Sequence, residues 1–440
     1  MNDSKTYSTI LDELEAVPII DSHDHTIAQE LAMNLAKRSS YLYDILLMQN
    51  NRSLLTYLPE ESWRMSQFDF GEAYGIKGHE DSEGDRKAEW RKLEPVLGFI
   101  RNDNQQRTFM RACKKLFDLS FDRIETEKQW IELSEKFSHA NRREDWYNRA
   151  IKEVGNIDLI LNVSFSSPEV DRTFFRSVMN MTDFLRGFDE SYLRKIETKY
   201  GVTIKSFDDY LDVLDDVFKK MVSTGTLALK DNSGYFRDLT YRDVTKKSAA
   251  KAFDPISHLG WANKSIAGED IENFTNFMTN ELARKCAAYD IPFQIHTGPP
   301  ANPATSNPAK LQELFEGNPE TTFVILHGAG ANVAEIASFL KFYRNIYIDL
   351  AWHLNGYPGP SGLKRVLYEL LEYVPYHKFC WGADCGAAEE SVGIYMQARE
   401  VLAAVLSRKV DEGWEDLDTG KMIGRGILRD NAIRLYKLDR

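Results

Sequence analysis

The first apolar run of the chain ends in two histidines that are separated by one residue. Val17–Ile20 has the composition of a buried strand, and His23 and His25 follow it directly in the segment DSHDH. Side chains at positions i and i+2 of a strand lie on the same face, with Cβ atoms about 6.5–7 Å apart. Two imidazoles at this spacing can bind one metal ion.

Later segments repeat this construction. Short apolar runs at 291–295 and 322–326 end in His296 and His327, the run 378–383 ends in Asp384, and the run 226–229 ends in Lys230. In a parallel barrel the carboxyl ends of all strands open on one face. We therefore expect side chains from five strands to meet there: His23, His25, Lys230, His296, His327 and Asp384.

Imidazoles and a carboxylate without thiolates suit a catalytic ion, with Zn²⁺ expected first and Mn²⁺ or Fe²⁺ as alternatives. We predict His23, His25, His296 and Asp384 as ligands. An open coordination position would hold a water of lowered pKa, and Asp384 would carry its proton to the leaving group. His327 is either a further ligand or a donor to a substrate carbonyl.

The remaining candidates point to an acidic substrate. Lys230 is either carbamylated, so that it bridges two metal ions, or remains an ammonium that binds an anion. Arginine binds carboxylates through two hydrogen bonds, so Arg176 and Arg237, with Tyr235, are candidates for holding a substrate carboxylate. Trp352, which follows the expected seventh strand, is a candidate for the pocket wall.

The pattern of apolar residues predicts the elements that position these groups. From residue 27 to residue 154 the chain favours helices, and from residue 155 onward strand and helix alternate. Eight strands in this alternation indicate an α/β fold, a closed (β/α)8 TIM barrel. We expect a barrel formed by residues 1–26 and 155–440, with residues 27–154 as a helical insertion after the first strand.

The composition of the chain limits the kinds of molecule that we expect it to bind. The 440 residues include 55 basic and 67 acidic side chains, a formal net charge of −12, which argues against affinity for nucleic acid or an anionic membrane. The start of the chain lacks a secretory pattern, and the four cysteines form no disulfide framework. We expect a cytoplasmic homo-oligomer that acts on a small molecule.

These residues resemble the amidohydrolase superfamily, which has His-x-His after strand one, histidines after strands five and six, and aspartate after strand eight. The second half is similar to the amidohydrolase domains related to nodulins and to those fused to glutamine synthetase. That narrower likeness rests on Lys230 with Tyr235 and Arg237, on the segment NIYIDL at 345–350 and on NAIRLY at 431–436. The resemblance implies that His23, His25 and Asp384 are metal ligands and that His296 and His327 complete the site.

Three functions fit this pattern. The leading hypothesis is a metal-dependent hydrolase that cleaves an amide or other C–N bond of a small carboxylate-bearing substrate. The second keeps the metal site but performs decarboxylation or uronate-type isomerisation, as similar superfamily members do. The third is a barrel that binds a ligand without chemistry.

Overall fold

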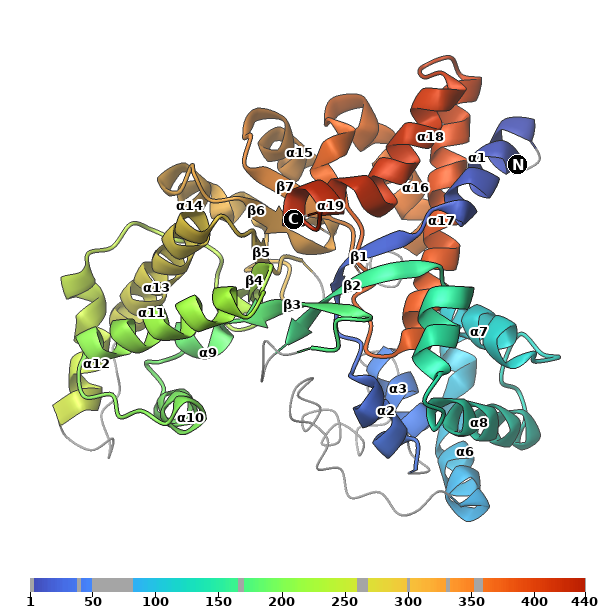
Figure 1. The fold of residues 1–440 in the computed structure, drawn as a ribbon, viewed down its shortest axis with the longest axis horizontal. Coiled ribbons are helices and arrows are strands. Elements are labelled where there is room, and N and C mark those ends of the chain that lie inside the picture. Colours follow the sequence, from blue (N-terminus) through green and yellow to red (C-terminus); the bar gives the residue numbers. More distant parts are fainter. Residues whose placement is uncertain are drawn as a thin grey trace.

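The fold is seen in a computed structural model of the full chain, and the description covers residues 4–37, 41–49, 82–164, 170–258, 268–298, 301–329, 333–351 and 359–439. Within these residues eight parallel strands form one sheet in the order of the sequence (Figure 1). They are β1 (Ile19–Asp24), β2 (Ile157–Ser164), β3 (Phe175–Asn180), β4 (Ala228–Asp231), β5 (Phe293–Ile295), β6 (Phe323–Ile325), β7 (Ile346–Asp349) and β8 (Phe379–Cys380). The predicted eight-stranded α/β barrel is confirmed.

The first and last strands close the sheet through a short seam. The amide of Asp384 donates to the carbonyl of His23 at 2.9 Å, and the amide of His25 donates to the carbonyl of Cys385 at 3.0 Å. The β1–β2 register also shifts between Asp21 and Asp24. Such an irregularity re-aims side chains at a barrel rim, and here it affects the segment that contains His23 and His25.

The barrel interior changes from apolar to polar along the strands. Small and branched residues, among them Val178, Ala228 and Val324, form the apolar part together with the C-terminal helix α19 (Asn431–Tyr436). Further along their strands, Lys230 and Gln294 are buried and face each other across β4 and β5. The polar groups therefore gather at the carboxyl ends of the strands, where barrel enzymes have their active sites.

Between β1 and β2 every described element is a helix. These elements are α2 (Gln29–Leu35), α3 (Tyr41–Gln49), α6 (Glu83–Leu97), a 3₁₀ helix (Gly98–Ile100), α7 (Asn104–Phe117), α8 (Glu127–Asn141) and a π-helical turn (Asn148–Val154). Helix α8 begins directly after Thr126, because Thr126 and Gln129 form a reciprocal capping box.

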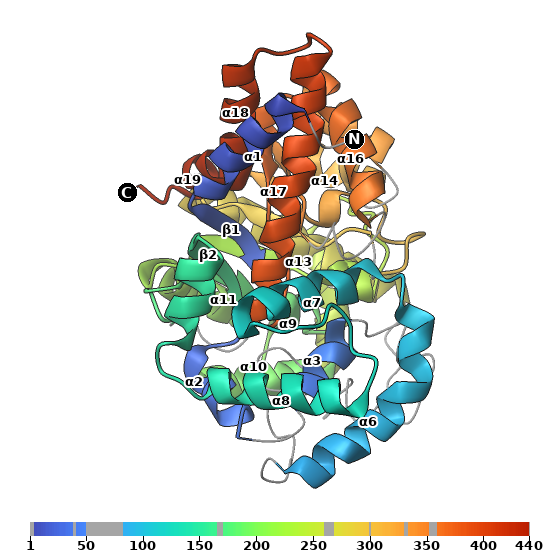
Figure 2. The same cartoon turned by 90° about the vertical axis from the view of Figure 1, so that its right-hand side faces the viewer.

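This helical segment packs against α17 (Ala388–Asp411), the helix that follows β8 (Figure 2). Arg111 of α7 pairs with Glu400, and the buried carboxylate of Glu389 accepts hydrogen bonds from Asn141 at 2.6 Å and from Trp146 at 2.9 Å. On this connectivity we propose the division into a barrel (1–26 and 155–440) and a helical insertion (27–154).

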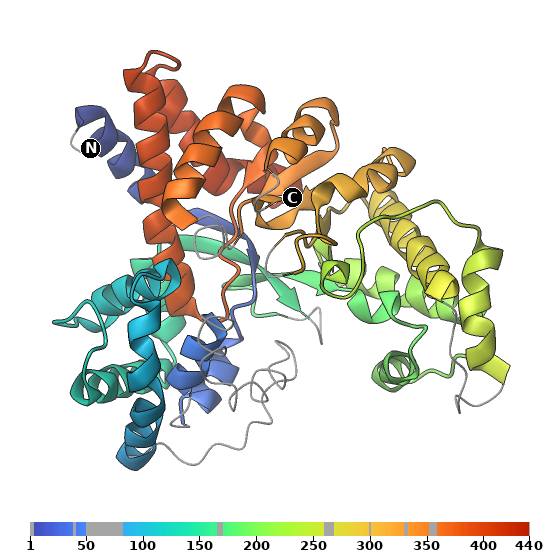
Figure 3. The same ribbon diagram turned by 180° about the vertical axis from the view of Figure 1, so that it is seen from behind.

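The other helices surround the sheet. They are α1 (Lys5–Ala16), α9 (Thr182–Leu185), α10 (Glu190–Tyr200), α11 (Phe207–Ser223), α12 (Lys246–His258), α13 (Gly268–Tyr289), α14 (Gln312–Gly317), α15 (Val333–Phe342), α16 (Gly359–Tyr373) and α18 (Leu417–Arg425). Helices α10–α13 lie on the opposite side of the sheet from the insertion (Figures 1 and 3). No described helix combines the length and the apolar composition that crossing a membrane requires.

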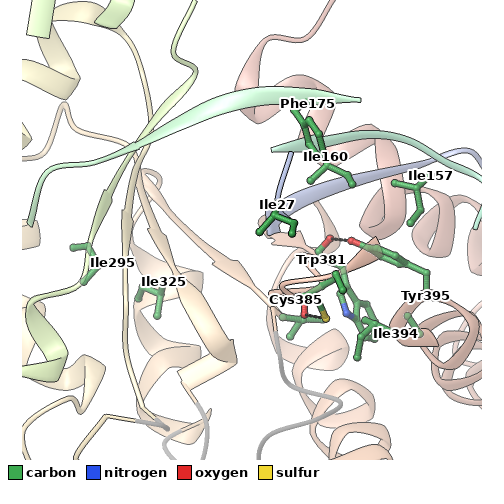
Figure 4. Packing of buried hydrophobic residues seen from close by; sticks show 14 of the residues in the cluster. Ile27, Ile157, Ile160, Phe175, Ile295, Ile325, Trp381, Cys385, Ile394 and Tyr395 are labelled. Atoms are coloured by element: carbon green, nitrogen blue, oxygen red, sulfur yellow. Dashed lines mark hydrogen bonds between the residues drawn. The ribbon is translucent and has the colours of Figure 1, made fainter. Parts of the chain in front are cut away.

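A cluster of buried hydrophobic residues holds the segment that follows β8 (Figure 4). The indole of Trp381 is fully buried, and the hydroxyl of Tyr395 on α17 donates to the Trp381 carbonyl at 2.8 Å. Ile157 and Ile160 of β2 belong to the same core. Because protein interiors pack about as densely as organic crystals, this core leaves the loop that follows Trp381 little freedom to move.

Candidate metal centre

Three of the four predicted ligands meet at the carboxyl end of the barrel. One nitrogen of His23, one nitrogen of His25 and a carboxylate oxygen of Asp384 all lie within 4.8 Å of one another. The Asp384 Oδ1 atom is 3.4 Å from Nε2 of His23 and 3.3 Å from Nε2 of His25. This spacing suits three ligands around a single ion.

The hydrogen-bond partner of His23 determines its protonation. Its Nδ1 atom lies 2.9 Å from the amide oxygen of Gln294, which can only accept, so Nδ1 carries the proton. Burial and the nearby charge of Lys230 lower the pKa of His23 to about 4, so the ring is neutral. Its Nε2 atom therefore presents a lone pair toward Asp384.

The same reasoning orders the protons on His296 and His327. The Nδ1 atom of His327 is 3.2 Å from the carbonyl of Ala351, so it donates, and its Nε2 atom accepts from Nδ1 of His296 at 2.7 Å. Burial lowers the pKa of His327 to about 3 and lowers that of His296 well below its usual value. The Nε2 atom of His296 is left with a lone pair and no hydrogen-bond partner among the described residues.

Asp384 completes the set of donor atoms. Burial opposes its ionisation, but the contacts with His23 and His25 and the proximity of His327 hold its pKa well below the usual range. Its Oδ2 atom lies 3.6 Å from Nδ1 of His327. The Nε2 lone pair of His23 thus faces the Asp384 carboxylate, and a divalent cation between them would be coordinated by both. These residues fit a metal ion.

The backbone is held in an unusual conformation at two of these residues. His327 has φ = 64° and Asp384 has φ = 57°, the left-handed region that non-glycine residues rarely adopt. Each such residue costs of the order of 1–3 kcal/mol, and such conformations cluster at functional sites. The surrounding packing and the seam between β1 and β8 maintain both.

Lys230 lies inside the barrel near these ligands. It is 1% exposed, and burial lowers the pKa of its amine to about 8, although the nearby carboxylates of Asp384, Asp231 and Asp349 oppose that shift. No hydrogen bond of its amine is formed with the described part of the chain. The charge of Lys230 contributes to the lowered pKa values of His23, His296 and His327, so its amine lies near these rings.

Tyr235 and Arg237 follow β4 but face different surroundings. The ring of Tyr235 lies 4.2 Å from that of His296, centroid to centroid, and the residue is 49% exposed, so it flanks the site beside solvent. Arg237 instead donates to Asn276 and to the carbonyls of Asp238 and Thr240. Its guanidinium is therefore largely satisfied by the protein, which leaves it little capacity for a substrate.

Arg176 occupies the second position of β3, at the amino end of that strand. Its Nη1 atom donates to the carbonyls of Arg172 and Phe175. The predicted ligands lie at the carboxyl ends of the strands, so Arg176 is at the other mouth of the barrel. Trp352 lies outside the described residues.

Two supporting carboxylates were not among the sequence predictions. Asp24 accepts from the amides of His25 at 2.6 Å and Cys385 at 2.7 Å, so it joins the two ligand-bearing loops. Asp349 accepts from the Ser22 hydroxyl and from the amide of Gly382. Asp349 is an acidic residue in an otherwise apolar run, and Asp24 lies between the two histidines, so a signal for each was available in the sequence.

Comparison with known proteins identifies relatives for part of the sequence and for the whole fold. Residues 261–438 match the family described as Amidohydrolase. Protein fluG of Emericella nidulans is 31% identical over 163 residues, which are 36% of this chain and 18% of that protein. The chain thus aligns with less than a fifth of this curated relative.

The similar solved structures match along their full length. Uronate isomerase of Thermotoga maritima has a TM-score of 0.74 at 14% identity, with 99% of this chain and 98% of that chain covered. Glucuronate isomerase of Caulobacter crescentus has a TM-score of 0.72 at 16% identity, with 100% of this chain and 96% of that chain covered. A protein of Lactobacillus casei, provisionally named a metal-dependent hydrolase, has a TM-score of 0.63 at 16% identity, with 98% of both chains covered.

These matches agree with the order of the ligand residues along the strands. The profile match covers the segments that contain His296, His327 and Asp384, and the solved structures share the eight-stranded fold that brings them to His23 and His25. The sequence matches over the second half of the chain support its membership in the amidohydrolase superfamily.

Proposed function

We propose that the protein is a metal-dependent hydrolase that cleaves an amide or other C–N bond of a small carboxylate-bearing molecule. The observation that carries this proposal is the convergence of His23, His25 and Asp384 within 4.8 Å at the carboxyl end of the barrel. His296 is the fourth ligand that we propose, because its Nε2 lone pair is buried and unpartnered within the described ranges.

When bound, a divalent cation, with Zn²⁺ expected first and Mn²⁺ or Fe²⁺ as alternatives, would supply Lewis acidity and lower the pKa of an attacking water. Asp384 is ionised at neutral pH and can take the proton of that water through Oδ2, whereas Oδ1 faces the histidines. The same carboxyl group then returns the proton to the departing nitrogen.

In this proposal His327 acts on the substrate carbonyl, and Lys230 acts on the substrate carboxylate or on the metal. The Nδ1–H group of His327 lies beside Asp384, and it would stabilise negative charge on the substrate carbonyl oxygen by exchanging its hydrogen bond to the Ala351 carbonyl for one to the substrate. Lys230 either binds the substrate carboxylate as an ammonium or, after reaction with CO2, becomes a further carboxylate ligand. Native mass spectrometry distinguishes these states, because only the second adds the mass of one CO2.

Among the predicted substrate-binding residues, the position of Tyr235 supports this role best, because its half-exposed ring lies tilted against His296. Arg237 and Arg176 remain candidates from the sequence, but their bonds to backbone carbonyls weigh against them. The substrates to test first are N-acyl amino acids and γ-glutamyl amides, because each has a carboxylate that Lys230 in its ammonium form would bind.

The decisive test is Asp384→Asn, with Asp12→Asn on the exposed face of α1 as the matched carboxylate-to-amide control. We expect the D384N variant to lose at least about 10²-fold in turnover, because the proton carrier is removed, and D12N to match the wild type. Turnover of D384N at the wild-type rate would refute the proposed role of Asp384.

A second candidate is isomerisation of an acidic sugar between aldose and ketose forms. It is favoured by the two uronate isomerases, whose chains match this one over at least 96% of their length, the segment between β1 and β2 included. The products separate the reactions: hydrolysis incorporates ¹⁸O from labelled water, isomerisation leaves the mass unchanged, and decarboxylation releases CO2.

The remaining alternative is a barrel that binds a ligand without chemistry. Elemental analysis of protein purified without chelators distinguishes it from both enzymes, because absence of stoichiometric metal would favour it. The cytoplasmic location and the homo-oligomer expected from the sequence stay predictions. Light scattering coupled to gel filtration tests the oligomer.

A further inference from the structure

A buried amide lies directly beneath the proposed metal ligands. Gln294 is fully buried on β5, two residues before His296, and its register partners are Lys230 on β4 and Val324 on β6. An uncharged side chain at this depth must have its polar atoms paired. The groups that form hydrogen bonds with the Gln294 amide therefore indicate what this side chain does.

The orientation of this amide is fixed by groups from two distant segments. Its Nε2 atom lies 3.1 Å from the carbonyl oxygen of Ser22 and 2.9 Å from the hydroxyl oxygen of Tyr436. A carbonyl oxygen can only accept a hydrogen bond, so the nitrogen must face Ser22. The amide oxygen then necessarily faces His23, where it lies 2.9 Å from Nδ1.

This orientation selects one tautomer of His23. If the proton were on Nε2, two acceptors would oppose each other at Nδ1 in a site without solvent, an arrangement that a protein interior strongly disfavours. With the proton on Nδ1, the hydrogen bond forms and the Nε2 lone pair faces Asp384, 3.4 Å away. Only the second arrangement leaves the nitrogen free to bind a cation.

Tyr436 connects this arrangement to the end of the chain. It belongs to α19, whose Ala432 and Leu435 pack with Val324 and Cys380 in the barrel interior. The Tyr436 hydroxyl accepts a hydrogen bond from Gln294, and Gln294 accepts one from His23. The C-terminal helix is thus two hydrogen bonds away from a proposed ligand.

We propose that Gln294 is a positioning residue that holds His23 in its Nδ1-protonated tautomer, and that Ser22 and Tyr436 hold the Gln294 amide in the orientation this requires. The inference deepens the proposed function, because it rests on His23 being a metal ligand. Loss of such an outer hydrogen bond typically weakens metal binding about 10- to 100-fold.

The test is the affinity of the purified full-length protein for Zn²⁺ and Mn²⁺, measured by competition with a chromophoric chelator. Gln294→Met keeps the side-chain length but removes the acceptor, and we expect affinity to fall about 10- to 100-fold. Gln294→Glu restores an acceptor opposite Nδ1 and should bind metal more tightly than Q294M. Tyr436→Phe removes one anchor of the amide and should cause a smaller, few-fold loss.

Val324→Ala is the matched control, because Val324 is the buried neighbour of Gln294 across β6 and makes no polar contact. It should lower thermal stability while leaving metal affinity unchanged. If Q294M folds and binds as tightly as V324A, the inference is overturned. If Q294M does not fold, a Y436F variant that binds metal as tightly as the wild type overturns it. A wild-type protein that binds no metal would instead overturn the proposed function.

Discussion

Substitution of Gly382 by alanine should open the barrel at its seam. Gly382 follows β8 beside His23, and an added Cβ atom would lie 2.5 Å from the carbonyl oxygen of His23, 2.7 Å from its Cβ and 2.8 Å from its nitrogen. These are backbone atoms or the atom next to them, so no flexible side chain can move aside. Only a displacement of one strand from the other can relieve the overlap.

The size of that displacement follows from the contacts. Ordinary van der Waals contact begins at 3.4 Å, so the overlap with the His23 carbonyl requires a movement of 3.4 − 2.5 = 0.9 Å. Metal–ligand distances tolerate only about 0.2 Å. Because His23 and Asp384 lie on either side of this contact, we expect G382A to lose stoichiometric metal and about 1–3 kcal/mol of stability.

The assay combines metal content after dialysis with thermal unfolding. Gly98→Ala is the control, because Gly98 has helical φ and ψ and nothing lies within 4 Å of its added Cβ. That substitution should leave metal content unchanged and raise stability by up to about 1 kcal/mol. A G382A protein with wild-type metal content and unfolding temperature would refute the description of the seam.

Three further predictions concern the metal, the substrate and pH. Removal of the metal by a chelator should lower the free energy of unfolding by about 2.7 kcal/mol, relative to protein in free metal at 100 times its Kd. Calorimetry should detect recovery when the ion is added back, and an unchanged unfolding free energy would contradict the site. Tyr235→Ala should raise KM about three- to tenfold with metal content unchanged, because one aromatic contact is lost; loss of metal would assign Tyr235 a different role. Lys378 is buried against the carbonyls of Tyr343 and Arg344, and burial lowers its pKa from 10.5 to about 8, so the unfolded chain binds more protons between those pH values. Stability should therefore rise from pH 8 to 10.5 by at most about 3 kcal/mol, and urea titrations of Lys378→Met should lack this rise; an identical pH profile would refute the shift.

Much of the fold and of the site could be predicted from local patterns. The apolar runs that end in His296, His327 and Asp384 are strands or lie at their ends, because parallel strands in a closed barrel all terminate at one rim. That rule holds regardless of the distance along the chain. The helices between β1 and β2 were predictable for a similar reason, because their spacing of apolar residues is local.

Other features were not predictable, because they depend on where a residue lies along its strand or on which helix packs beside it. Arg176 was expected near a substrate, but it lies at the amino end of β3, and strand boundaries are the least certain part of a sequence prediction. Arg237 was expected to be available, but its acceptors come partly from α13, a helix whose placement no local pattern specifies. The helices α9, α10 and α12 were likewise not foreseen.

The sequence by itself determined which atoms can bind a cation and the order in which strands deliver them: imidazoles at positions 23, 25 and 296 and a carboxylate at 384. The tertiary structure alone decided where the protons lie and how closely the ligands approach. The proton on His23 depends on Gln294, whose orientation depends on Ser22 and Tyr436, and these groups come from three separate parts of the chain. A hydrogen bond has a direction that only the folded arrangement of donors and acceptors can fix.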